Sequence, residues 1–213
     1  MPNTPAPVTE WSSYCDAAEH PVHGPYHNRE YGFRVRDDQV LFERLMLEIN
    51  QAGLSWLTIL KKRDAFRRAY RDFDIDAVAR FTARDRARLM RDAGIIRNRL
   101  KINAAVENAR RLRAIRASHG SFCGWLDAQH PLSLDEWRVL FKRTFLFTGG
   151  EIVREFLVST GYLPGAHRQS CPAFAAALRS RPPWKRARRP RTEDRGPRTE
   201  DRRPKTEDLR AKS

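Results

Sequence analysis

The chain has 213 residues, of which 40% are hydrophobic and 31% are charged, so it can form one domain with a buried core, alone or with a tail. Its 41 lysines and arginines exceed its 26 acidic residues and give a net charge of +15, which favours a polyanionic partner such as nucleic acid. No apolar run approaches the roughly 18 residues of a membrane span, and the first residues lack the order of a signal peptide. We therefore expect a cytoplasmic protein without membrane contact.

The composition divides the chain into three parts. Residues 1–10 are rich in proline and small side chains and are expected to be disordered, whereas residues 11–179 carry the helical domain. Three near-copies of a seven-residue unit, PRTEDRG, PRTEDRR and PKTEDLR, follow from Pro190. Because each unit opens with proline and has almost no apolar residue to bury, residues 180–213 are predicted to be a disordered basic tail.

Helical patterns follow one another after an irregular segment, residues 11–32, that is punctuated by proline and glycine. Asp74 before IDAVARF and the pair Thr82 and Asp85 supply two of the helix starts. No alternating run of strand length stands out, so the predicted fold class is all-α, a helical bundle. The expected helices are residues 37–51, 55–70, 75–81, 83–93, 98–118, 121–128, 134–144 and 150–160.

One helix, in the stretch LFERLMLEINQAGLSW, carries a carboxylate at the border of its apolar arc. At about 100° per residue, Glu48 lies next to the apolar positions and is partly desolvated. Two interpretations are open: an ion pair with Arg44 four residues earlier, or a functional acid. The letters AGLS then predict a turn that displays Leu54, with Ser55 as the N-cap of a helix that begins at Trp56.

Cysteine and histidine gather near both ends of the helical domain. The chain has three cysteines, an odd number that argues against a disulfide framework and makes metal ligation the alternative to test. His167 and Cys171 form an H-x3-C pair, and Cys15 is followed by three histidines in the irregular segment: His20, His23 and His27. Two cysteines and two histidines match the closed ligand set of structural zinc, although spacing alone leaves a surface histidine and an inert cysteine as the alternative.

The stretch LMRDAGIIRNRLKI predicts one helix end, a turn with Gly94 and the start of a second helix. This pattern resembles a helix-hairpin-helix, in which hairpin amides and the next helix N-terminus face a DNA phosphate. Arg97, Arg99 and Lys101 add positive charge. A glycine C-cap between two ordinary helices is the alternative. The motif would position DNA without reading its sequence, because phosphate contacts carry no direct base information.

The stretch LFERLMLEINQAGLSWLTILKKR is similar to the signature of the DNA-3-methyladenine glycosylase I family of base-excision repair enzymes, and the likeness extends from about Tyr14 to Cys171. The resemblance implies a monofunctional glycosylase that flips out and hydrolytically releases 3-methyladenine from alkylated double-stranded DNA. It also implies a Zn²⁺ that joins the N- and C-terminal segments. That ion would be structural, because four protein ligands leave no position for water. The ligands implied are Cys15, His27, His167 and Cys171, while Cys123 is left as a buried small hydrophobe.

The same resemblance assigns the pocket. Glu48 is the main functional residue, as base recogniser and electrostatic stabiliser, and Tyr26 and Trp56 complete the base-binding walls. Stacking of Trp56 on a cationic base adds a cation–π component that normal adenine lacks. The DNA-binding residues implied are Leu54 as the wedge, Gly94, Arg97, Arg99 and Lys101. Glu30 matches another acid that recurs in the family, and a structural role is equally open for it. Tyr31 stands where the family often has tryptophan, and this difference leaves the range of lesions undetermined.

Two other functions remain open. In the first, the enzyme is bifunctional and Lys101 is a Schiff-base nucleophile that leads to backbone cleavage. In the second, the protein is a non-catalytic, zinc-dependent DNA-binding module whose pocket residues are core packing. Glu48 argues against the second, because an unpaired carboxylate at an apolar border gains nothing for packing. We expect a monomer, since one chain supplies both pocket and hairpin.

Overall fold

The computed structural model describes residues 13–186, and these residues form α-helices and short 3-10 helices with no β-strand among them, which confirms the all-α prediction. The predicted disorder of residues 1–10 and of the repeats from Pro190 lies outside the described residues. The α-helices are α1 (His23–Arg29), α2 (Asp38–Gln51), α3 (Trp56–Ala69), α4 (Ile75–Ala79), α5 (Ala83–Arg91), α6 (Arg99–His119), α7 (Phe122–Gln129), α8 (Leu134–Thr144), α9 (Gly150–Ser159) and α10 (Pro172–Arg179). The 3-10 helices are η1 (Tyr14–Ala17), η2 (Arg71–Phe73) and η3 (Pro183–Lys185).

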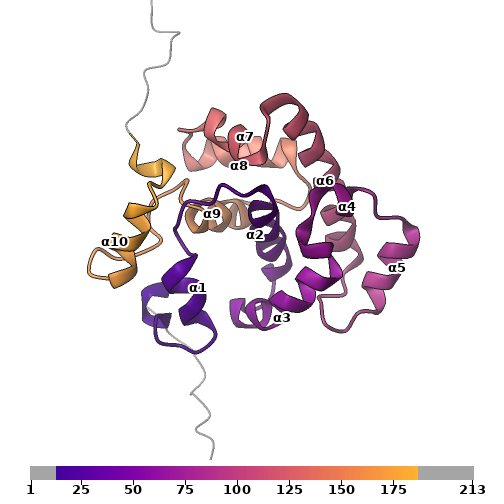
Figure 1. Ribbon diagram of the computed structural model, residues 1–213, viewed down its shortest axis with the longest axis horizontal. Helices are drawn as coiled ribbons and strands as arrows, with labels where there is room; N and C mark the ends of the chain where they lie inside the picture. Colours follow the sequence, from indigo (N-terminus) through magenta and orange to yellow (C-terminus); the bar gives the residue numbers. More distant parts are fainter. Residues whose placement is uncertain (1–12, 187–213) are drawn as a thin grey trace, which may run out of the picture.

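The helix α2 runs through the middle of the molecule, and helices from both halves of the chain surround it (Figure 1). α3, α6, α7 and α9 all contact it. At one end of the molecule α1 lies beside α10, so that segments far apart in the sequence meet there, and α4 and α5 lie toward the other end. Within residues 13–186, none of the helices has the length and hydrophobicity that a bilayer crossing requires.

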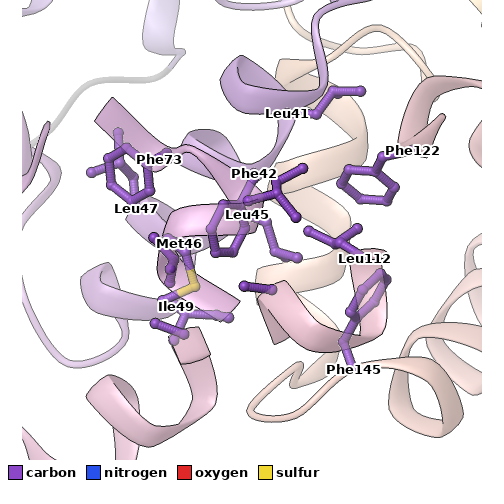
Figure 2. Packing of buried hydrophobic residues seen from close by; sticks show 14 of the residues in the cluster. Leu41, Phe42, Leu45, Met46, Leu47, Ile49, Phe73, Leu112, Phe122 and Phe145 are labelled. Atoms are coloured by element: carbon purple, nitrogen blue, oxygen red, sulfur yellow. The ribbon is translucent and has the colours of Figure 1, made fainter. Parts of the chain in front are cut away.

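The core is built around α2, which is buried on all sides rather than along one arc. Figure 2 shows the apolar side chains of this helix among aromatic and aliphatic residues of other elements, including Phe73, Leu112, Phe122 and Phe145. The prediction of a single apolar face was therefore too narrow. Because α2 is enclosed from Leu41 onward, the charged residues Glu43, Arg44 and Glu48 are buried as well, and each needs a partner or a function.

Local signals placed several helix starts correctly. Asp74 and Ser55 cap α4 and α3 through their side chains, and Thr82 forms a capping box with Asp85 at the start of α5. These caps act within one helical turn, so they do not depend on the rest of the fold.

The ends of the domain differ from the sequence-based prediction. The irregular segment contains the helix α1, and the unpredicted helix α10 follows Cys171. Residues 180–186 belong to the fold rather than to the tail: the Ser180 hydroxyl accepts a hydrogen bond from the Arg34 amide at 3.0 Å, and Pro183 is buried. The short elements were missed because tertiary contacts, rather than a long apolar period, hold them in place.

Candidate active site and metal centre

A cavity of about 370 Å³ opens beside the C-terminal half of α2. Four aromatic side chains and one buried carboxylate give it an apolar wall with a few polar groups, as is typical of sites for small flat molecules. Its lining residues are Tyr14, Tyr26, Tyr31, Glu48, Gln51, Trp56, Glu151 and Glu155. The cavity thus contains the three residues predicted to bind a base.

Glu48 supplies the buried acid of this cavity. Its side chain lies in the last turns of α2 and the residue is only 5% exposed. Burial, followed by the nearby carboxylates of Glu155 and Glu151, raises the pKa of Glu48 to about 8 against the opposing charge of Arg44. A carboxyl group with a pKa near neutrality responds strongly to any cation that enters the cavity.

The alternative interpretation of Glu48, an ion pair with Arg44, is not what the structure contains. The Arg44 guanidinium is buried and donates to Glu30 Oε2 at 2.5 Å. Arg63 also donates to both oxygens of Glu30, at 2.7 and 2.8 Å, and these two arginines hold the pKa of Glu30 below its usual value despite burial. Glu30 therefore has a structural role, and the other buried acid of α2, Glu43, pairs with Arg63 and Arg67.

The aromatic wall is formed by Tyr26 and Trp56, whose ring centroids lie 5.3 Å apart at an interplanar angle of 62°. Arg44 lies 4.4 Å from the centroid of Tyr26 on the ring face, which fixes the orientation of the tyrosine. The Tyr26 hydroxyl is buried and has no hydrogen-bond partner among the described residues. Such an unpartnered buried hydroxyl is costly to the free protein, so a ligand that supplies a partner gains by it.

The predicted turn at Leu54 is present. Gly53 has a φ of +84°, a left-handed conformation that glycine adopts without strain, and the Leu54 amide donates to the Gln51 carbonyl at 2.6 Å. The Leu54 side chain is 37% exposed, and the Ser55 hydroxyl accepts from the Thr58 amide at 3.2 Å to start α3. The turn therefore displays an aliphatic side chain between Gln51 and Trp56, two residues that line the cavity.

All four predicted metal ligands come together in one buried cluster. The ligand atoms of Cys15, His27, His167 and Cys171 lie within 4.8 Å of one another. His27 Nε2 lies 3.7 Å from Cys171 Sγ and 3.1 Å from His167 Nδ1, close to the ligand separations of about 3.3–3.6 Å that a tetrahedral zinc ion imposes. The cluster joins the first segments of the described chain to the loop before α10, so it can hold a metal that ties both ends together.

Hydrogen bonds outside the cluster orient both histidines. His27 Nδ1 donates to the Asn28 side-chain oxygen at 2.7 Å, and His167 Nε2 donates to the Tyr31 carbonyl at 2.7 Å. Each histidine therefore presents its other nitrogen to the cluster, as metal-binding histidines do. His20 and His23, the other two histidines of the irregular segment, lie outside the cluster, and Cys123 is a buried core residue, as predicted.

The segment between α5 and α6 forms the predicted helix, turn and helix. A Cβ atom at Gly94 would lie 2.9 Å from the Ala65 side chain, so glycine is needed for the close approach to α3. The Gly94 amide donates to Asp92 Oδ1 at 2.8 Å, and Asn98 caps α6. Arg97 and Arg99 are exposed, and within residues 13–186 the amides of residues 96 and 97 form no hydrogen bond.

Lys101 has a different environment from the one predicted. It is 5% exposed, and its ammonium donates to the carbonyl oxygens of Asn50 and Ala52 at 3.0 and 2.8 Å. These carbonyls belong to the C-terminal end of α2, where a cation satisfies acceptors that the helix leaves free. Held there, the ammonium is not presented to a phosphate, and the geometry favours a structural role over the predicted DNA contact.

Sequence reasoning did not assign several lining residues, notably Glu151 and Glu155 on α9. Glu155 accepts a hydrogen bond from the Tyr31 hydroxyl at 3.1 Å, and burial raises its pKa. Arg154 pairs with both acids at the rim of the cavity. The spacing of four residues places both on one face of a helix, but no local signal indicates that this face meets α2.

Known proteins are similar to this chain in sequence and in fold. Residues 16–131 match the model of the methyladenine glycosylase family. The chain is 34% identical over 173 residues to the DNA-3-methyladenine glycosylase of Haemophilus influenzae, covering 72% of this chain and 93% of the relative. It is 46% identical over 93 residues to DNA-3-methyladenine glycosylase 1 of Escherichia coli, covering 44% of this chain and 50% of that protein.

A solved structure is similar as well. The structure of 3-methyladenine DNA glycosylase I from Staphylococcus aureus matches with a TM-score of 0.67 at 32% sequence identity, covering 76% of this chain and 95% of that one. The family match spans more than half of this chain, and the solved structure shares its fold. The chain therefore belongs to the DNA-3-methyladenine glycosylase I family.

Proposed function

We propose that this protein is a monofunctional DNA glycosylase that flips 3-methyladenine out of alkylated double-stranded DNA and releases it by hydrolysis, as a step of base excision repair. The observation that carries the proposal is the buried Glu48 carboxyl group in an aromatic cavity beside the exposed Leu54 turn. A packing role does not account for Glu48, because its neighbour Arg44 is committed to Glu30.

Recognition depends on the positive charge of the methylated base. Trp56 offers an aromatic face, to which a cationic purine binds more strongly than a neutral one. Glu48 accepts hydrogen bonds from the adenine edge, and its ionisation becomes favourable when a cation lies beside it. Tyr26 adds a second aromatic wall and an unpartnered hydroxyl. Normal bases lack the positive charge, so they bind more weakly in the same cavity.

The reaction itself makes modest demands on the protein. When the bond between the sugar carbon and the base nitrogen breaks, its electron pair neutralises the cationic base, which is therefore a good leaving group. Water then adds to the sugar carbon and loses a proton. Glu48 stabilises the positive charge of the bound base and of the sugar as the bond breaks, which is an electrostatic contribution rather than proton transfer.

The DNA would be held by two elements. Leu54 fills the space that the flipped base leaves, at a cost of a few kcal/mol for unstacking. The segment between α5 and α6 acts as a helix-hairpin-helix whose free amides at residues 96 and 97 face a phosphate, with Gly94 allowing the close approach to α3 and Arg97 and Arg99 adding charge. The elements that would hold DNA of any sequence are thus separate from the cavity that would recognise the base.

The metal would be Zn²⁺, held by Cys15, His27, His167 and Cys171. Thiolate and imidazole are the ligands that zinc prefers, and four protein ligands leave no position for water. The ion would therefore stabilise the junction of the N- and C-terminal segments, close to Tyr26, and take no part in hydrolysis. We expect the protein to act as a cytoplasmic monomer.

The bifunctional alternative is less favoured, because the Lys101 ammonium is buried and engaged by two carbonyl oxygens. Borohydride trapping on DNA with an abasic site tests it directly. We expect no covalent adduct, whereas a trapped adduct that disappears in Lys101→Met would establish the lyase activity.

The experiment that tests the proposed function is release of free bases from methylated duplex DNA by the wild type and Glu48→Gln. We expect the wild type to release 3-methyladenine and the variant to bind DNA and fold normally but to release base at least ~100-fold more slowly. Thermal stability and metal content serve as controls for folding. If the wild type binds DNA and releases nothing, the protein is a DNA-binding module and not a glycosylase.

A further inference from the structure

Phe147 is an exposed aromatic residue in a strained backbone conformation. It lies in the loop between α8 and α9, is 40% exposed and has a φ of +63°. A bulky side chain in the left-handed region costs about 1–3 kcal/mol, and such residues persist where the surrounding structure holds them in place. Neither core packing nor the base cavity requires this ring.

Contacts on both sides of Phe147 hold the loop rigidly. The buried Asn108 side chain of α6 donates to the Leu146 carbonyl at 3.1 Å and accepts from the Leu146 amide at 2.8 Å. On the other side, the Thr148 hydroxyl donates to the Phe141 carbonyl at 3.1 Å. The residues on both sides of Phe147 are therefore anchored, and the ring itself lies partly exposed at the surface.

That position is next to the Leu54 turn. The Lys101 ammonium lies 5.9 Å from the centroid of the Phe147 ring, and the same ammonium donates to the carbonyl of Ala52, two residues before Leu54. Four residues after Phe147, Glu151 lines the base cavity. Leu54 and Phe147 are thus two exposed apolar side chains on different elements, each within four residues of a residue that lines the cavity.

We propose that Phe147 is a second DNA-penetrating side chain, which stacks on the bases next to the gap while Leu54 fills the gap itself. The inference rests on the proposed function, because it assumes that a base leaves the duplex at this cavity. The ring lines a groove with Lys142 and with Arg138, which pairs with the exposed Asp135, and these positive charges suit the phosphates beside an inserted aromatic ring. Stacking on bases tolerates any sequence, as a repair enzyme needs.

The test compares four variants: Phe147→Ala, Phe147→Gly, Phe147→Trp and Val139→Ala. Val139 is the matched control, because it is 66% exposed and lines the same groove but belongs to α8. Two affinities are measured for each: that for duplex DNA carrying an abasic-site analogue, and that for free 3-methyladenine. Thermal unfolding is followed in parallel.

We expect Phe147→Ala and Phe147→Gly to weaken duplex binding roughly tenfold, within the range of one base–aromatic stack. Free-base affinity should stay unchanged in both, since the ring is outside the cavity. Phe147→Trp should retain duplex affinity, and Val139→Ala should bind like the wild type. Phe147→Gly should also unfold at a temperature at or above that of Phe147→Ala, because glycine adopts the left-handed conformation without strain.

Unchanged duplex affinity in Phe147→Ala would overturn the inference, and so would an equal loss in Val139→Ala, which would indicate general contact with the groove. A fall in free-base affinity would overturn it too, by placing the ring in the pocket. Duplex affinity is measurable whether or not base is released. Failure of the wild type to release 3-methyladenine therefore counts against the proposed function alone.

Discussion

Arg44 and Glu48 lie one helical turn apart on α2, yet the Arg44 guanidinium pairs with Glu30 and not with Glu48. The pairing leaves Glu48 buried in the cavity with its pKa raised to about 8, first by burial and then by two neighbouring carboxylates. Glu48, the proposed functional acid, is thus separate from the ion pairs that Glu30 forms with Arg44 and Arg63.

The raised pKa of Glu48 predicts a pH-dependent stability. A carboxyl group ionises near pH 4.5 in the unfolded chain but near pH 8 in the folded one, so the folded state binds the extra proton and loses stability as the pH rises between these values. Glu48→Gln removes this dependence. We expect the unfolding free energy of the variant, relative to that of the wild type, to rise by up to about 1.4 kcal/mol per pH unit from pH 5 to pH 8. Urea denaturation at several pH values measures the difference, and a constant difference would contradict the assignment.

The ion pairs of Glu30 with Arg44 and Arg63 should contribute more to the free energy of unfolding than an exposed ion pair does. Glu30→Gln leaves Arg44 buried without its carboxylate, and we expect a loss of about 2 kcal/mol or more, below the ~3–5 kcal/mol of a fully buried pair because Glu30 is partly exposed. Glu107→Gln is the control, since Glu107 pairs with Arg110 and Arg111 on the surface of α6 and should cost less than about 1 kcal/mol. Equal losses in chemical denaturation would indicate that the ion pairs of Glu30 add nothing.

Metal binding should depend on the clustered cysteines and not on the third. Cys171→Ser should lose the bound metal and unfold at a lower temperature, because the ion joins the two ends of the domain. Cys123→Ser should keep one equivalent of metal, since Cys123 lies in the core away from the cluster. Elemental analysis and thermal unfolding with and without a chelator measure both effects. An unchanged melting temperature after metal removal would show that the ion is not structural.

The two basic residues at the start of α6 should behave differently. Lys101→Met removes two charge-assisted hydrogen bonds to the end of α2, and we expect a loss of about 1–3 kcal/mol in unfolding free energy. Arg99→Met, at an exposed position, should leave stability unchanged but reduce the salt dependence of DNA binding by about one phosphate contact. Denaturation and DNA titration at several salt concentrations separate these roles. The opposite pattern would make Lys101 the phosphate contact.

The sequence by itself determined the local features of this protein. Helix caps at Ser55 and Asp74 and the turn with Gly53 involve groups no more than four residues apart, so residue type and order predict them. The four candidate metal ligands and the candidate pocket residues Tyr26, Glu48 and Trp56 were also predicted from the sequence, through their residue types and the resemblance to a family, and the structure brings each set together.

Only the tertiary structure decided how the charges pair. The sequence suggested Glu48 as a partner of Arg44 and a DNA phosphate as a partner of Lys101. In the structure Arg44 pairs with Glu30, and Lys101 binds the carbonyl oxygens at the end of α2. It also brings Glu151 and Glu155 from α9 to the cavity. A buried charge is stable only beside a partner whose attraction offsets the cost of desolvation. The packing of helices that are far apart in the chain determines which partner that is, and local sequence patterns do not encode this packing.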